Sequence, residues 1–158
     1  MKETVTYERM KGAIGSLLLL WATIETAARI ETDRGGGQAL TKNARGAGAV
    51  LAAWVRMIQS KVQDNSAAAR LALNLHAQLL EPLEVRNGVC HGLDGISASW
   101  GDEPATITWR AKGKCEIRTW EELQVMFAFL SKIPRAIGLI SDCALNQGTT
   151  VWDLPNAA

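Results

Sequence analysis

The stretch AAARLALNLHAQLLEPLEVR, residues 67–86, decides the fold class of this chain. Its leucines recur at intervals of four residues, which is the spacing of an apolar stripe along one face of a helix: Leu71, Leu75, Leu79 and Leu83. The cluster Asp64-Asn65-Ser66 lies directly before it and is typical of a turn that caps a helix. Pro82 is expected to kink the helix locally. The stretch therefore predicts a long amphipathic helix and a mainly α protein.

Two segments before this stretch have the same period. Apolar residues spaced three and four apart predict a first helix over about residues 4–31: Tyr7, Met10, Ile14, Leu17, Leu18, Trp21, Ile24 and Ala28. Three consecutive glycines, Gly35–Gly37, end it. Residues 43–61 predict a second helix, with a buried face made of Leu51, Trp54, Val55 and Ile58.

Past Asp94 the apolar spacing changes. Residues 97–100, 106–109 and 115–118 carry β-type side chains separated by turn residues, which indicates two or three short antiparallel strands. Thr119 and Glu122 have the spacing of a capping box, and a fourth helix follows, which Pro134 bends or divides. The sequence predicts a single-domain helical bundle of four long helices over residues 1–145. A short β-hairpin is inserted before the last helix, and residues 146–158 form a C-terminal tail.

Composition excludes several classes of protein. Of the 158 residues, 47% are hydrophobic and 21% charged, with a net charge of +1, which argues against intrinsic disorder. Three cysteines and two histidines favour neither a disulfide framework nor a zinc site. We expect a cytoplasmic protein with no metal and no cofactor. The apolar run at residues 13–24 is too short to span a bilayer, and Glu3, Glu8 and Glu25 do not suit a signal peptide.

Residues Arg86–Gly92, RNGVCHG, carry the side chains suited to chemistry on an anion. Arginine supplies a permanent charge with forked donors for phosphate, and histidine carries protons near neutral pH. Asn87 and His91 are four residues apart, so they share a face if the helix continues. Gly88 and Gly92 are candidates for the C-terminal turn of the helix. Cys90 is not expected to act as a nucleophile, because no second histidine lies nearby in the sequence.

The segment resembles the Arg-x4-6-His motif of the HEPN superfamily (higher eukaryotes and prokaryotes nucleotide-binding domains). Arg86 and His91 match the motif, and Asn87 matches the polar residue that many members place after the arginine. The order of elements is also similar to that family. The resemblance implies a metal-independent endoribonuclease that works as a homodimer, with Arg86, Asn87 and His91 in the catalytic site. It also implies a toxin with an antitoxin protein as partner, or a role in antiphage defence.

A purely structural role would also account for Arg86 and His91. At the end of a helix, such side chains bond the last carbonyls, and this needs no ligand. Arg70 and His76 give a second match to the motif, but they lie in mid-helix, and we interpret His76 as a core or interface residue.

Glu25 is a candidate supporting residue. On an ideal helix it points in nearly the same direction as Tyr7, Ile14 and Leu18. A carboxylate on an apolar face is expected to be paired, with Arg86, Arg70 or His91 as its partner. The alternative is that this edge of the helix is solvated.

The predicted hairpin carries basic residues beside aromatic ones. Arg110, Lys112 and Lys114 are candidates for binding RNA, together with Arg118 and with Trp100, Trp109 and Trp120. The alternative is that the lysines protect an edge strand and the tryptophans cover the bundle.

The sequence as a whole predicts a metal-independent endoribonuclease. In such a reaction His91 carries protons, Arg86 binds the phosphate, and Asn87 orients either the phosphate or the imidazole of His91. A homodimer brings two His91 side chains to one cleft. The alternatives are a non-catalytic module that binds a nucleotide or a partner protein, and a helical interaction protein with an incidental motif.

Overall fold

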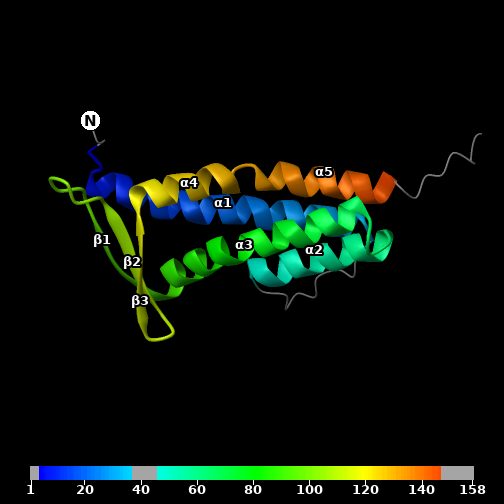
Figure 1. The fold of residues 1–158 in the computed structure, drawn as a ribbon, viewed down its shortest axis with the longest axis horizontal. Coiled ribbons are helices and arrows are strands. Elements are labelled where there is room, and N and C mark those ends of the chain that lie inside the picture. Colours follow the sequence, from blue (N-terminus) through cyan, green and yellow to red (C-terminus); the bar gives the residue numbers. More distant parts are fainter. Residues whose placement is uncertain (1–3, 37–45, 147–158) are drawn as a thin grey trace, which may run out of the picture. The chain divides into compact units, whose positions relative to one another are not determined.

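The computed structural model describes residues 4–36 and 46–146. It is mainly α-helical, with a small antiparallel sheet inserted between the third and fourth helices (Figure 1). The helices are α1 (Tyr7–Arg34), α2 (Ala47–Lys61), α3 (Ala67–Gly92), α4 (Trp120–Leu130) and α5 (Ile133–Asn146). The strands are β1 (Leu93–Ser97), β2 (Thr106–Ala111) and β3 (Lys114–Thr119). The predicted fold class is confirmed.

The predicted fourth helix is divided, as Pro134 suggested. Helix α4 ends at Leu130, and α5 begins at Ile133 and has Pro134 in its first turn, where a missing N–H costs nothing. The predicted tail is outside the described part of the chain from residue 147 onward.

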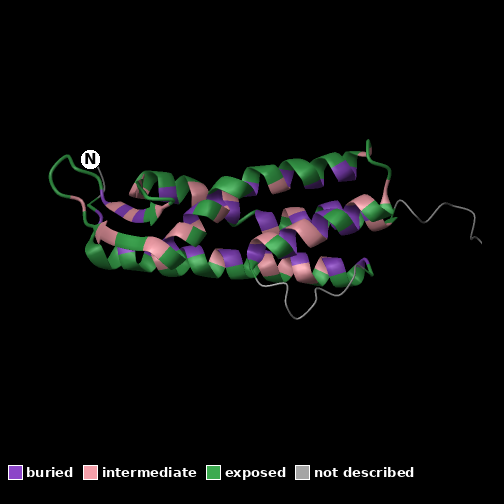
Figure 2. Ribbon diagram, turned by 90° about the horizontal axis from the view of Figure 1, so that it is seen from below, coloured by how far each residue is buried: buried purple, intermediate pink, exposed green. Residues whose placement is uncertain are grey.

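By internal contacts the chain divides into two compact units, and helices α1 and α3 contribute to both. The sheet unit comprises Met1–Ile24 and Leu79–Ile133, and the helical unit comprises Glu25–Gln78 and Pro134–Ala158. Both units are built from segments distant in the sequence. Along each helix, buried residues alternate with exposed ones, which is the pattern of a helix that buries one stripe (Figure 2).

The sheet unit has its core between helices and the central strand. Buried side chains come from α1, α3, β2 and α4: Met10, Leu17, Trp21, Leu79, Val85, Val89, Ile107, Trp109, Leu123 and Leu130. Strand β2 pairs with β1 on one side and β3 on the other, both antiparallel. The first strand differs from the prediction of residues 97–100, because β1 starts at Leu93, directly after α3 ends. Trp100 lies instead in an isolated bridge with Glu103.

In the helical unit, a buried tryptophan of α2 is hydrogen-bonded to α5. Trp54 of α2 donates its Nε1–H to Ser141 Oγ of α5 at 2.9 Å, and both residues are buried. Ser141 Oγ donates in turn to the Ile137 carbonyl at 2.8 Å. The predicted buried face of α2, with Leu51, Val55 and Ile58, is confirmed. Arg34 forms an ion pair with Asp142, and the hydrogen bond that its guanidinium donates to the Asp142 carboxylate raises the pKa of the guanidinium.

Among the described residues, two segments are long and apolar enough to cross a membrane, judged only by length and composition: α1 and the stretch Trp120–Asn146. Core helices of soluble proteins pass the same criteria, so this is a weak indication. The absence of membrane contact and the cytoplasmic location stay predictions.

The capping box at the start of α4 is confirmed. Thr119 Oγ1 accepts a hydrogen bond from Glu122 N at 3.3 Å, and Glu122 Oε2 accepts one from Thr119 N at 2.8 Å. The bond from the Thr119 N–H lowers the pKa of the Glu122 carboxyl. A lowered carboxyl pKa stabilises the fold above the ordinary pKa of glutamate, and this contribution is lost as the pH falls through the lowered value.

Replacing the capping threonine should destabilise the protein measurably. We expect Thr119→Ala to lower the free energy of unfolding by about 0.5–2 kcal/mol, because an N–H in the first turn of α4 loses its acceptor. Urea unfolding of Thr119→Ala, with Thr26→Ala at an exposed position of α1 as the matched control, measures this. Equal unfolding midpoints for the two variants would contradict a role of the cap in stability.

Candidate functional site

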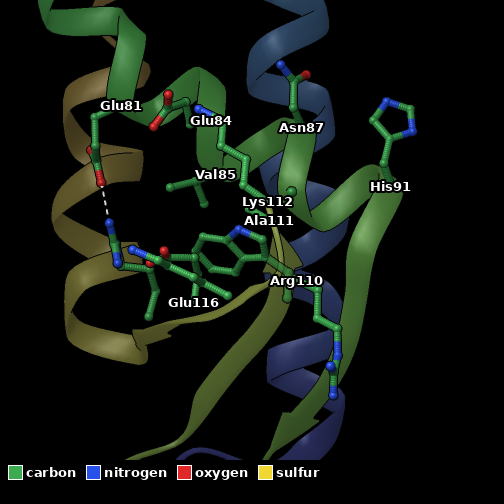
Figure 3. A pocket seen from close by; sticks show the side chains of 13 residues that line it. Glu81, Glu84, Val85, Asn87, His91, Arg110, Ala111, Lys112 and Glu116 are labelled. Atoms are coloured by element: carbon green, nitrogen blue, oxygen red, sulfur yellow. Dashed lines mark hydrogen bonds and ion pairs between the residues drawn. The ribbon is translucent and has the colours of Figure 1, made fainter.

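The motif residues Asn87 and His91 lie on the last turns of α3, which continues to Gly92 rather than ending near Arg86. Both residues are exposed, and their spacing of four places them on one face of the helix. This face borders a groove whose other side is the β2–β3 hairpin (Figure 3). The groove has a volume of about 530 Å³.

Two glycines explain how the sheet lies so near α3. A Cβ atom at Gly88 would overlap the indole of Trp109, and one at Gly92 would overlap the Arg110 carbonyl oxygen. Neither glycine has a positive φ, and Gly88 lies inside the helix, so the predicted role of Gly88 in a C-terminal turn is wrong. These glycines permit close approach of β2, since any side chain would push the strand away.

The lining of the groove combines cations and carboxylates. Its members are Glu81, Glu84, Val85, Asn87, Gly88, His91, Trp109, Arg110, Ala111, Lys112, Lys114, Glu116 and Arg118. The three predicted RNA-binding residues, Arg110, Lys112 and Lys114, are therefore brought together with Asn87 and His91. Lys112 and Lys114 reach the groove because the chain reverses direction between β2 and β3.

The turn between β2 and β3 presents one of the lysines. Ala111 pairs with Lys114, so the loop has two residues, Lys112 and Gly113, with φ values of 51° and 78°. Two residues of positive φ define the tight hairpin turn that suits the twist of paired strands. The side chain of Lys112 extends from this turn toward α3, on the side of Glu84 (Figure 3).

The arginines of the hairpin already have partners. Arg118 forms a 2.7 Å ion pair with Glu81 of α3, and its guanidinium lies 5.7 Å from the centre of the Trp109 ring. Arg110 is 3.6 Å from Asp94 and projects away from His91 (Figure 3). The lysines are thus the hairpin cations best placed to meet a ligand.

The three tryptophans in and beside the sheet differ in their environments. Trp109 is 3% exposed and underlies the groove, whereas Trp100 is 85% exposed. Trp120 is contacted by the Arg9 guanidinium, 5.0 Å from its ring centre. Trp109 and the half-buried Trp120 fit the interpretation of tryptophans that cover the bundle, whereas the exposed Trp100 does not.

Arg86 differs from its predicted place at the phosphate. It is not among the groove-lining residues, its side chain is half-buried, and its Nη1 donates to Asn87 Oδ1 at 2.9 Å. The physical reason is helix geometry: five residues correspond to a rotation of about 140°, so Arg86 and His91 project from different sides of α3.

Glu25 has a partner on its own helix. Its carboxylate pairs with Arg29 at 2.9 Å, and its side chain is 25% exposed. The predicted pairing with Arg86, Arg70 or His91 is therefore wrong. The direction shared with Tyr7 and Leu18 is not the buried face, since those two side chains are exposed and the buried stripe of α1 runs through Leu17, Trp21 and Ile24.

The sequence pattern did not indicate the carboxylates of the groove, Glu81, Glu84 and Glu116. Glu84 and Glu116 line the groove, and neither forms an ion pair within the described residues. Glu84, Asn87 and His91 have the spacing of one helix face, which is the signal that would have indicated Glu84. Glu116 has no such signal, because its position depends on the pairing of β3 with β2.

The other histidine and the cysteine of the motif lie elsewhere. His76 is half-buried in the part of α3 that belongs to the helical unit, and Cys90 is exposed but does not line the groove. Within residues 4–36 and 46–146, no group of three or more potential ligands could hold a metal ion.

No known protein family, characterised protein or solved structure matched this chain. Its functional assignment depends on the geometry of the groove.

Proposed function

We propose that the groove between α3 and the hairpin binds single-stranded RNA and cleaves it without a metal ion, as an endoribonuclease of the HEPN type. One observation carries the proposal. The motif residues Asn87 and His91 and the basic residues of the hairpin, which are two separate features of the sequence, line the same groove. A proton carrier beside cations is the set of groups that phosphodiester cleavage requires.

The chemistry uses the nucleophile of the RNA itself. A base removes the proton of a 2′-hydroxyl, whose oxygen attacks the adjacent phosphorus. The bond from phosphorus to the 5′-oxygen then breaks, and an acid protonates that leaving oxygen. In this scheme His91 carries a proton, and Lys112 and Lys114 stabilise the charge that develops on the phosphate. The products are a 2′,3′-cyclic phosphate and a free 5′-hydroxyl.

A second proton carrier is needed to complete the reaction. Of the two histidines, only His91 lines the groove. We propose that a two-fold homodimer places the His91 of a second copy opposite the first, so that one acts as base and the other as acid. A toxin role with an antitoxin protein belongs to the same proposal, since uncontrolled RNA cleavage harms the host cell.

A non-catalytic function is the second candidate. One chain offers a single histidine in the groove, and three carboxylates balance most of its positive charge. These observations favour a module that binds a nucleotide rather than a long RNA. Such a module would be stabilised against heating by a nucleotide and would leave RNA intact.

Cleavage should depend on the 2′-hydroxyl and not on divalent cations. We expect the protein to cut single-stranded RNA in excess chelator, to release 2′,3′-cyclic phosphate ends, and to leave DNA of the same sequence intact. Gel analysis of end-labelled strands measures all three. Lys112→Gln should weaken RNA binding, whereas Lys132→Gln, an exposed lysine outside the groove, serves as the matched control.

Two results would contradict the endoribonuclease. One is cleavage only after magnesium is added. The other is intact RNA under every condition together with stabilisation by a mononucleotide, which would establish the binding module instead.

A further inference from the structure

The hydrogen bond between Arg86 and Asn87 engages the oxygen of the Asn87 carboxamide and leaves its nitrogen available for a ligand. Arg86 Nη1 lies 2.9 Å from Asn87 Oδ1. A guanidinium has only donors, so the atom that accepts from it must be the amide oxygen. The two N–H groups on Asn87 Nδ2 remain without a bond to a described residue, and Asn87 lines the groove.

Arg86 itself lies away from the groove. It is not among the lining residues, and its Nε is buried without a hydrogen-bond partner in the described part of the chain. A half-buried guanidinium whose one side-chain bond goes to a groove residue is well placed to hold that residue. It is poorly placed to contact a phosphate on the far side of the helix.

We propose that Arg86 is a positioning residue, which holds the Asn87 carboxamide so that Nδ2 donates to a phosphate oxygen of the bound RNA. The inference rests on the proposed function of the groove. A free carboxamide presents its oxygen and its nitrogen with similar ease, and an oxygen would repel a phosphate. The hydrogen bond from Arg86 fixes the orientation of the amide before the RNA binds. The conformational entropy of the Asn87 side chain is therefore lost on folding and not on binding.

The competing role for Arg86 is direct contact with phosphate, and salt dependence separates the two. A contact between a cation and a phosphate releases counterions, so each one adds about 0.7 to the slope of log affinity against log salt for a single strand. A residue that acts through a neutral amide adds nothing to that slope.

The experiment measures binding to a ten-nucleotide RNA whose 2′-hydroxyls are methylated, so that cleavage does not interfere. We expect Asn87→Ala to weaken binding about tenfold, the effect of one hydrogen bond to a charged group. Arg86→Gln should weaken it similarly. The double variant should bind no more weakly than Asn87→Ala alone, because Arg86 acts only through Asn87.

The salt slopes give an independent readout. Lys112→Gln should lower the slope by about 0.7. Arg86→Gln should leave it at the wild-type value, as should Arg70→Gln, which removes an exposed arginine of the same helix outside the groove. Thermal unfolding of every variant establishes that it is folded.

Asn87→Asp keeps the proposal testable even if Arg86→Gln is unstable. It retains an oxygen for Arg86 and so should fold, yet it replaces the N–H donors by a negative charge and should abolish binding. The proposal would be overturned if Asn87→Asp bound RNA as tightly as the wild type. It would also be overturned if the double variant lost the product of the two single losses in affinity, or if Arg86→Gln lowered the slope of log affinity against log salt. Wild-type protein that neither binds nor cuts RNA would overturn the proposed function as well.

Discussion

Replacing His91 by alanine is expected to lower the rate of RNA cleavage by about 10²–10⁴-fold, the range that general acid–base catalysis supplies. Affinity for RNA should change little, because the lysines of the hairpin remain. The measurement is a single-turnover cleavage rate beside a binding titration with methylated RNA. Loss of rate without loss of affinity distinguishes proton transfer from simple contact with the phosphate.

The chain offers its own control for this experiment. His76→Ala removes the other histidine, which is half-buried in α3 and does not line the groove. It should cut RNA at the wild-type rate, provided that its melting temperature shows a folded protein. An unchanged rate in His91→Ala would refute the assignment of this residue. A monomer by light scattering that still cleaves RNA would instead refute the shared site of the homodimer.

Gly88→Ala is expected to destabilise the protein because its Cβ would overlap the indole of Trp109. Overpacking of a well-packed site costs about 1–3 kcal/mol, while alanine in a helix gains up to about 1 kcal/mol over glycine. The comparison is with Gly12→Ala in α1, where a Cβ meets nothing within 4 Å. Because the gain in helix propensity is common to both, the difference between the variants measures the overlap.

Thermal unfolding gives the result directly. Gly12→Ala should melt above the wild type, and Gly88→Ala should melt below Gly12→Ala by about 2–4 °C for each kcal/mol of overlap. RNA affinity should also fall in Gly88→Ala, since β2 must move away from α3 and carries Arg110 and the hairpin lysines with it. Equal melting temperatures for the two variants would show that the strand is not held against Gly88.

Features set by neighbouring residues were predictable from the sequence. The helix period located α1, α2 and α3, the capping box located the start of α4, and Pro134 located its separation from α5. The association of Asn87 with His91 was also predictable, because residues four apart share a helix face wherever the helix lies. The start of β1 was not predictable, because α3 continues beyond Arg86 and the strand begins only where Leu93 pairs with Trp109.

The sequence by itself determined the helices, the hairpin and the face shared by Asn87 and His91, since each depends on bonds or spacings within a few residues. The tertiary structure alone decided that this face meets the hairpin, that Arg86 lies outside the groove, and that Glu84 and Glu116 join its lining. Helix periodicity predicts which side chains share a face of the helix, but not which segment of the chain packs against that face. The close approach of β2 to Gly88 and Gly92 places the hairpin against this face of α3. It depends on contacts between segments distant in the chain.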